Sequence, residues 1–134
     1  MRIKDLMKTY LFTLHENDMI QDASHIMKLE RIRHIPIVDD DYKLVGLVTY
    51  KELIGMLIKK LTNIPVKDIM RKDIKTVEPE TPLKGAIEVM ILNKIDCLPV
   101  LDNHKKLIGI VTEIDLLKFL YDMVKMPDDF YSKT

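Results

Sequence analysis

The chain of 134 residues has one cysteine, Cys97, no net charge and no long apolar run. A single cysteine excludes an internal disulfide and is typical of a reducing cytoplasm. A net charge of zero without a basic block argues against a protein whose main task is to neutralise nucleic-acid phosphates. No segment reaches the roughly 20 apolar residues of a membrane span, and the N-terminus lacks the apolar centre of a secretory signal. We therefore expect a cytoplasmic protein without a membrane anchor.

The sequence also has little that indicates catalysis or metal binding. His15, His25 and His104 are scattered without the spacing of metal ligands, and we interpret them as surface residues. We find no activated nucleophile and no Walker-type phosphate loop. Cys97 flanks an apolar segment and is interpreted as a small apolar filler rather than a nucleophile. These patterns predict neither an enzyme nor a metal site.

What the chain does contain is an internal repeat. Residues 4–7, 35–39 and 44–49 each have a close counterpart 63 positions later, so two copies align without a gap. Two superposable units are expected to pack face to face about a local two-fold axis, and any ligand site should then occur twice. A unit of roughly 60 residues is marginal by itself, so we expect the two units to need each other.

Within each copy the hydrophobic pattern changes in one fixed order: strand, helix, strand, strand, helix. In the first copy the expected strands are 11–14, 34–39 and 44–48, and the expected helices are 17–31 and 50–61. The second copy has a strand at 74–77, a helix capped by Thr81 with Pro82 in its first turn, and a last helix at 113–123. The predicted fold class is α/β (α+β), with two β-α-β-β-α units packed about a pseudo-two-fold axis.

These patterns divide the chain into unit 1 at 1–62, unit 2 at 63–122 and a C-terminal tail at 123–134, with both units in one module. Pro127 is expected to stop the last helix. For Phe130 and Tyr131 in the tail two alternatives stay open: docking on the body or a second subunit, or a frayed end.

In both copies a strand leads into a helix that has Thr at its start and an acid three residues later. The pairs are Thr112 with Asp115 and Thr49 with Glu52. One interpretation is a capping box, in which the acid bonds back to the N–H of the cap. The other is a ligand site, in which the helix start and the Thr contact a phosphate and the acid accepts ribose hydroxyls. The residues alone leave both open; the shorter Asp115 is the better ribose acceptor.

The repeated Lys-Asp-hydrophobic-Met openings, the strands with a proline before a final Asp, and the ending Gly-hydrophobic-hydrophobic-Thr-x-x-Asp resemble a tandem cystathionine-β-synthase (CBS) domain pair, or Bateman module. The resemblance covers Ile3 to about Leu120. It implies a non-catalytic regulatory module that binds an adenosine-containing ligand between its units. The ligands it implies are AMP, ADP or ATP first, then NAD or S-adenosylmethionine. It also implies a homodimer formed through helices and a partner protein that reads a conformational change.

The resemblance further implies that each cleft takes residues from both units. The first expected cleft comprises Tyr10, Phe12, Ile32, Arg33, His34, Ile35, Pro36, Ile110, Thr112 and Asp115. The second comprises Thr49, Glu52, Asp73, Lys75, Ile95, Asp96, Cys97, Leu98 and Pro99. Met7 and Met70, which open the repeats, are further candidates for lining the clefts.

The two expected clefts differ in chemistry. In the first, we assign Asp115 to the ribose, Thr112 to the phosphate side, and Arg33 with His34 to charge neutralisation. The alternative for Arg33 is an ordinary solvated surface charge. In the second, Glu52 stands where the family usually has Asp. We therefore expect one good cleft, the first.

The main rival function is a structural module with empty clefts, used only for dimerisation. Replacing Asp115 with Ala separates the two, because only a sensor would lose ligand affinity. Some relatives are reported to bind RNA or DNA, but the zero net charge and few aromatics argue against nucleic acid as a partner here.

Overall fold

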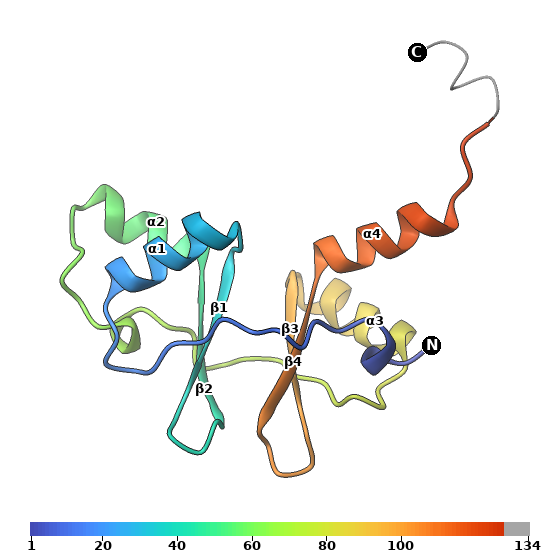
Figure 1. The fold of residues 1–134 in the computed structure, drawn as a ribbon, viewed down its shortest axis with the longest axis horizontal. Helices are drawn as coiled ribbons and strands as arrows, with labels where there is room; N and C mark the ends of the chain where they lie inside the picture. Colours follow the sequence, from blue (N-terminus) through green and yellow to red (C-terminus); the bar gives the residue numbers. More distant parts are fainter. Residues whose placement is uncertain (128–134) are drawn as a thin grey trace.

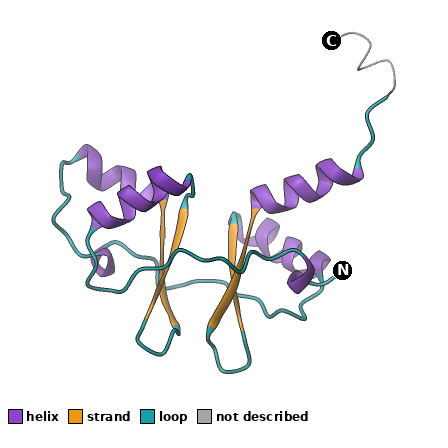
Figure 2. Ribbon diagram, in the orientation of Figure 1, coloured by secondary structure: helices purple, strands orange, loops and turns teal. Residues whose placement is uncertain are grey.

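Each unit of the fold is built on a β-hairpin. The computed structural model describes residues 1–127. In the first unit, β1 (His34–Val38) pairs antiparallel with β2 (Leu44–Thr49). In the second, β3 (Cys97–Leu101) pairs in the same way with β4 (Leu107–Thr112). Figures 1 and 2 show the two hairpins side by side, with their turns at the same end of the molecule. The mixed α+β class and the two equivalent units are as predicted.

Residues 1–127 contain four α-helices, and none of them lies at the end of the molecule where the hairpins turn (Figure 2). They are α1 (Ile20–Glu30), α2 (Tyr50–Ile58), α3 (Leu83–Asn93) and α4 (Glu113–Met123). Short 3-10 turns, η1 (Ile3–Asp5) and η2 (Val66–Asp68), open the two copies. Because α2 and α4 follow β2 and β4 without a loop, their first turns are fixed to the strand ends. In the described part of the chain, no helix has the length and apolar composition needed to cross a membrane.

The pseudo-two-fold axis passes between the two hairpins. Lys43 and Lys106, which are 63 positions apart in the sequence, form an antiparallel bridge with each other. Beside them the Leu107 N–H donates to the Tyr42 carbonyl at 3.0 Å. Two repeat counterparts that pair with each other lie on either side of the axis that relates the copies, so the axis passes between them. The repeat thus corresponds to a real symmetry of the fold.

The two copies exchange their opening segments. The Ile3 N–H donates to the Thr81 carbonyl and the Leu83 N–H to the Met1 carbonyl, both at 2.9 Å. Ile3 is fully buried in the core of the second unit. In return, Val66 is fully buried in the core of the first unit. In Figure 1 the dark-blue N-terminal segment begins beside α3 and crosses toward the other hairpin. Each core is therefore completed by residues from the other copy.

A small third cluster joins the hairpins to each other. Leu47 of β2, Cys97 of β3 and Ile110 of β4 are all buried there, and Leu11 and Ile74 pack against them. Burying apolar side chains between two units that are each marginal in size stabilises their association. The walls of any cleft between the units are thus fixed by packing.

The strands predicted at 11–14 and 74–77 are not formed. Each is reduced to one isolated parallel bridge, Leu14 with Ile37 and Val77 with Val100. The physical reason is that these stretches cross from one unit to the other, so only their last residues run alongside a hairpin. Their first residues, Leu11 and Ile74, pack between the hairpins instead.

The predicted helix ends also need correction. Thr81 does not cap α3, which begins at Leu83 with Pro82 as its cap. The Thr81 hydroxyl instead accepts the N–H of Glu78 at 3.0 Å and closes the preceding turn. α1 begins at Ile20 rather than at 17, and α2 ends at Ile58 rather than near 61. The bounds of α4 agree with the prediction, and Phe130 and Tyr131 lie outside the described residues.

Candidate ligand-binding cleft

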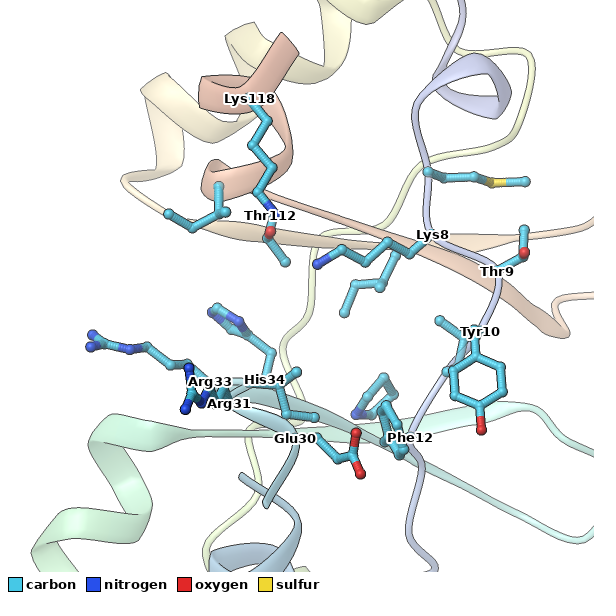
Figure 3. Close-up of a pocket in the computed structure, with 16 residues that line it drawn as sticks. Lys8, Thr9, Tyr10, Phe12, Glu30, Arg31, Arg33, His34, Thr112 and Lys118 are labelled. Carbon is cyan, nitrogen blue, oxygen red and sulfur yellow. The ribbon is translucent and has the colours of Figure 1, made fainter. Parts of the chain in front are cut away.

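A cavity of about 720 Å³ lies between the two units, within the usual size range for small-molecule sites. We call it the first cleft (Figure 3). Its lining is Met7, Lys8, Thr9, Tyr10, Leu11, Phe12, Glu30, Arg31, Ile32, Arg33, His34, Pro36, Ile110, Thr112, Ile114 and Lys118. These residues come from both units. Residues 7–12, which we call the crossing segment, contribute together with the end of α1, the start of β1, the end of β4 and α4. The cleft thus depends on the pairing of the two copies.

One wall of the first cleft is aromatic and apolar. The rings of Tyr10 and Phe12 meet edge to face, with centroids 5.4 Å apart and planes at 85°. Ile32, Pro36 and Ile110 continue this wall. Such a surface accepts a flat apolar or heteroaromatic group.

The opposite end of the first cleft is the start of α4. Thr112 is the N-cap of α4, and the backbone N–H of Thr112 donates to Asp115 Oδ2 at 2.9 Å. The Thr112 hydroxyl also donates to that oxygen, at 3.1 Å. The acid-to-cap bond of the capping interpretation is therefore present. The helix dipole at this end of α4 also favours an anion, although the Glu113 N–H already donates to the Asp96 carbonyl at 2.9 Å.

Asp115 is the one buried charged residue among those described, with 8% of its surface exposed. A buried carboxylate needs a partner. Besides Thr112 it has Lys8, whose Nζ lies 3.2 Å from Asp115 Oδ1. Lys8 belongs to the segment that crosses from the other copy, and its side chain is about half exposed. Sequence reasoning missed Lys8; the signal that could have found it is Arg71, the basic residue at the same place in the second copy.

The lining of the first cleft carries more positive than negative charge. Lys8, Arg31, Arg33 and Lys118 face a single lining acid, Glu30. In Figure 3 the Lys118 side chain runs toward Thr112, and Arg31 and Arg33 lie on the facing side. Arg31 follows the end of α1 in the left-handed conformation, with φ 56°, which turns the chain sharply toward β1. The cavity therefore favours an anionic group beside its apolar wall.

Two side-chain contacts lie between the first cleft and the corresponding cavity at the start of α2. His34 Nε2 of the first unit is 3.0 Å from Asp96 Oδ1 of the second. The guanidinium of Arg33 lies 5.5 Å from the centre of the Tyr50 ring. Arg33 lines both cavities and is at the same time exposed to solvent, as the alternative of a surface charge expects.

The second cleft, of about 460 Å³, repeats the geometry with different chemistry. Asp73 and Lys75 replace the aromatic pair of the first cleft. Its acid, Glu52, accepts a bond from the Thr49 hydroxyl and is paired with Arg71, whose Nε is 2.6 Å from Glu52 Oε1. Burial raises the pKa of the Cys97 thiol in its wall well above the ordinary value, so the thiol is protonated at neutral pH.

Most residues expected in the two clefts are brought together. The first cleft contains Tyr10, Phe12, Ile32, Arg33, His34, Pro36, Ile110 and Thr112, and the second contains Thr49, Asp73, Lys75, Ile95, Asp96 and Cys97. Met7 also lines the first cleft. Asp115 and Glu52 lie behind the linings, each bonded to its Thr. Ile35 and Leu98 are fully buried in the unit cores, and Pro99 is absent from the lining of the second cleft.

Several lining residues were not expected. In the first cleft these are Lys8, Thr9, Leu11, Glu30, Arg31, Ile114 and Lys118. Ile114 and Lys118 lie in the first and second turns of α4, where only the direction of the helix shows that they face the cavity. Among residues 1–127, no three His, Cys, Asp or Glu side chains gather as a metal site would require.

Comparison with known proteins places this geometry in a family. A model of the CBS domain matches twice, at residues 3–59 and 66–122. Homoserine O-acetyltransferase from Methanohalobium evestigatum is 34% identical over 118 residues, which are 88% of this chain but 24% of that enzyme. The chain thus spans about a quarter of the length of that curated relative.

Two solved structures are similar over nearly their whole length. One is a CBS domain pair in complex with 5′-methylthioadenosine and S-adenosyl-L-methionine, with 27% identity and a TM-score of 0.85, covering 92% of this chain and 98% of that one. The other is CBSX2, a CBS-pair protein from Arabidopsis thaliana, in complex with AMP. It has 26% identity and a TM-score of 0.81, covering 91% of this chain and 97% of that one. The present chain belongs to the CBS domain family and carries two copies of the domain.

Proposed function

We propose that this chain is a non-catalytic cytoplasmic regulatory module that binds an adenosine-containing ligand, of the AMP, ADP or ATP class, in the first cleft. One observation carries the proposal. A single cavity has an aromatic wall and an excess of lysine and arginine, and the buried carboxylate of Asp115 lies directly behind its lining residue Thr112 at a helix start. These three features match the three parts of a nucleotide: base, ribose and phosphate.

The parts of the ligand follow from the positions of these groups. The base lies against the wall formed by Tyr10 and Phe12. The ribose hydroxyls donate to Asp115, and the phosphate lies at the start of α4 beside Thr112. Arg33 and His34 neutralise the phosphate charge from the facing unit. Each contact is a proposal that rests on the geometry of the first cleft.

The charge of the cleft supports a phosphate-bearing ligand over a cationic one. Related structures hold S-adenosyl-L-methionine with 5′-methylthioadenosine in one case and AMP in another. In this chain Lys8, Arg31 and Lys118 would repel a sulfonium group and attract a phosphate. NAD, which carries phosphates, and S-adenosylmethionine remain the alternatives to test.

We also propose how the module signals. Ligand bound between the units changes their relative angle or rigidity, and a regulated protein responds to the difference. Larger relatives contain a similar segment as about a quarter of their length, which supports a partner domain as the reader.

A homodimer formed through the helices is the second part of the proposal. Ile114, Leu117, Leu120 and Tyr121 of α4 are more than half exposed. Figure 1 shows α4 projecting away from the body of the molecule. Apolar residues that recur along one helix favour burial against a second apolar face. A ligand-free dimerisation module, the rival function, would use the same surface and leave the first cleft empty.

Calorimetric titration tests the proposal. Wild-type protein is titrated with AMP, ADP, ATP, NAD and S-adenosylmethionine, and Asp115→Ala is titrated in parallel. We expect saturable binding of at least one adenine nucleotide, and a loss of affinity in Asp115→Ala with an unchanged oligomeric state. No binding of any of the five at millimolar concentration would contradict the sensor and favour the dimerisation module. Chromatography of each nucleotide after incubation checks for turnover, which we do not expect.

A further inference from the structure

We propose that Lys8 is a specificity-determining residue: an internal competitor for Asp115 that makes the first cleft prefer nucleotides over nucleosides. This inference rests on the proposed function, because it concerns how the same cleft chooses among adenosine-containing ligands. It begins from the bonds that Asp115 already makes in this structure. Oδ2 accepts the N–H and the hydroxyl of Thr112, at 2.9 and 3.1 Å. Oδ1 is paired with Lys8 Nζ at 3.2 Å.

A ribose therefore meets an acid whose oxygens are both engaged. The bonds to Oδ2 come from the residue that caps α4, so breaking them would disturb the start of that helix. The bond to Oδ1 comes from a flexible side chain that is 46% exposed. Displacing Lys8 is the easier route, and ligand binding then begins with the loss of this ion pair.

The displaced ammonium stays next to the ligand. Lys8 lines the first cleft, and Figure 3 shows its amino end directed into the space between Thr112 and His34. That space adjoins the start of α4, where a phosphate would lie. When a nucleotide displaces Lys8 from Asp115, its phosphate thus becomes the new anionic partner of Lys8. A nucleoside also breaks the ion pair between Lys8 and Asp115, but it has no phosphate to bind the displaced ammonium.

The second cleft contains the same kind of ion pair between a basic residue and the acid, at a shorter distance. Arg71 occupies the position that matches Lys8, and its Nε is 2.6 Å from Glu52 Oε1. The other oxygen of Glu52 is bonded by the Thr49 hydroxyl. Arginine binds a carboxylate through a planar set of donors that lysine lacks. Arg71 therefore holds the acid of the second cleft more firmly, which disfavours a ribose there.

The test compares two ligands across matched variants. AMP and adenosine are titrated into wild type, Lys8→Met and Lys118→Met. Both variants remove a cation from the first cleft, but only Lys8→Met also removes the competitor of the ribose. We expect Lys8→Met to bind adenosine about threefold to tenfold more tightly than wild type, while its affinity for AMP stays equal or falls. We expect Lys118→Met to weaken AMP and leave adenosine unchanged.

The outcomes separate the two proposals. If wild type binds AMP but Lys8→Met weakens or leaves unchanged the binding of adenosine, the role of Lys8 is overturned and the nucleotide sensor stands. If wild type binds neither ligand, both proposals fail. Lys8→Gln, which keeps a neutral donor near Asp115, is measured alongside in case Lys8→Met does not fold. It should tighten adenosine in the same direction but less strongly.

Discussion

Met7 occupies the space where a side chain at Gly109 would begin. A Cβ built on Gly109 lies 2.6 Å from Met7 Sδ and 3.1 Å from the Lys8 carbonyl oxygen. Gly46 and Met70 repeat the arrangement in the other copy. Each glycine thus lets the opening segment of one copy cross directly over a strand of the other. The crossing also brings Lys8 to Asp115.

Gly109→Ala should destabilise the protein and loosen this crossing. The new methyl group meets backbone as well as side-chain atoms, so the segment must shift, at a cost of about 1–3 kcal/mol in the free energy of unfolding. Urea denaturation measures the change. Gly55→Ala in α2 is the matched control, because its methyl group meets nothing within 4 Å. Its higher helix propensity should stabilise by up to about 1 kcal/mol. Equal effects of the two substitutions would contradict the crossing as described.

The buried thiol of Cys97 should make the protein less stable at alkaline pH. Burial raises the pKa of its thiol, and the Asp96 and Asp115 carboxylates raise it further. Unfolded, the thiol ionises near its usual pKa of about 8.5, while the native thiol keeps its proton. Above that pH the native state binds more protons, so the free energy of unfolding falls by about 1.4 kcal/mol per pH unit.

Cys97→Ala removes this contribution. We expect the wild-type and Cys97→Ala stability curves to run parallel from pH 6 to 8 and to converge or cross between pH 9 and 10.5. Urea denaturation across this range is the measurement. Curves that stay parallel to pH 10.5 would show that the thiol is not protected by burial.

Leu117→Glu should dissociate the proposed homodimer. Leu117 is 55% exposed on α4, outside both cleft linings, so a charge there disturbs the apolar helix face without touching the ligand site. Sedimentation velocity should show a dimer for wild type and a monomer for the variant. Asn103→Glu, in the exposed hairpin turn of the second unit, is the control and should remain dimeric. A wild-type monomer at micromolar concentration would refute this part of the proposal.

Arg33→Ala should weaken binding in proportion to the phosphate charge of the ligand. Arg33 lines both clefts, and the proposed binding mode assigns its guanidinium to the phosphate end of the ligand. We expect a loss of about threefold to tenfold for AMP and a larger loss for ATP, measured by titration at constant ionic strength. Equal losses for AMP, ATP and adenosine would show instead that Arg33 acts through the shape of the cleft.

The repeat predicted the hairpins, the position of α4 and the pairing of the units, because these depend on local hydrophobic period and on symmetry. It could not predict the exchange of the opening segments. A segment that packs on its own unit and one that packs on the other copy have the same sequence pattern, since the copies are alike. The missing strands at 11–14 and 74–77 have the same origin, because both stretches cross between units.

The same limit applied to the first cleft. Thr112, Tyr10 and His34 could be chosen from local motifs and from the family resemblance. Lys8 was missed, because its contact with Asp115 exists only after the crossing has formed, and the sequence marks the position only by a second basic residue, Arg71, 63 positions later. Ile35 was expected in the lining but is fully buried, since successive residues of a strand point to opposite faces and its neighbours His34 and Pro36 take the cleft side.

Residue-level mapping of AMP binding by two-dimensional amide NMR tests the first cleft most directly. We predict that AMP shifts the amide signals of Thr112, Ile114, Ile32 and His34, which belong to the first cleft. The signals of Lys51, Lys75 and Ile95 in the second cleft should move little at the same AMP concentration. Shifts confined to the second cleft, or no saturable shifts in the first, would contradict a nucleotide site at the start of α4.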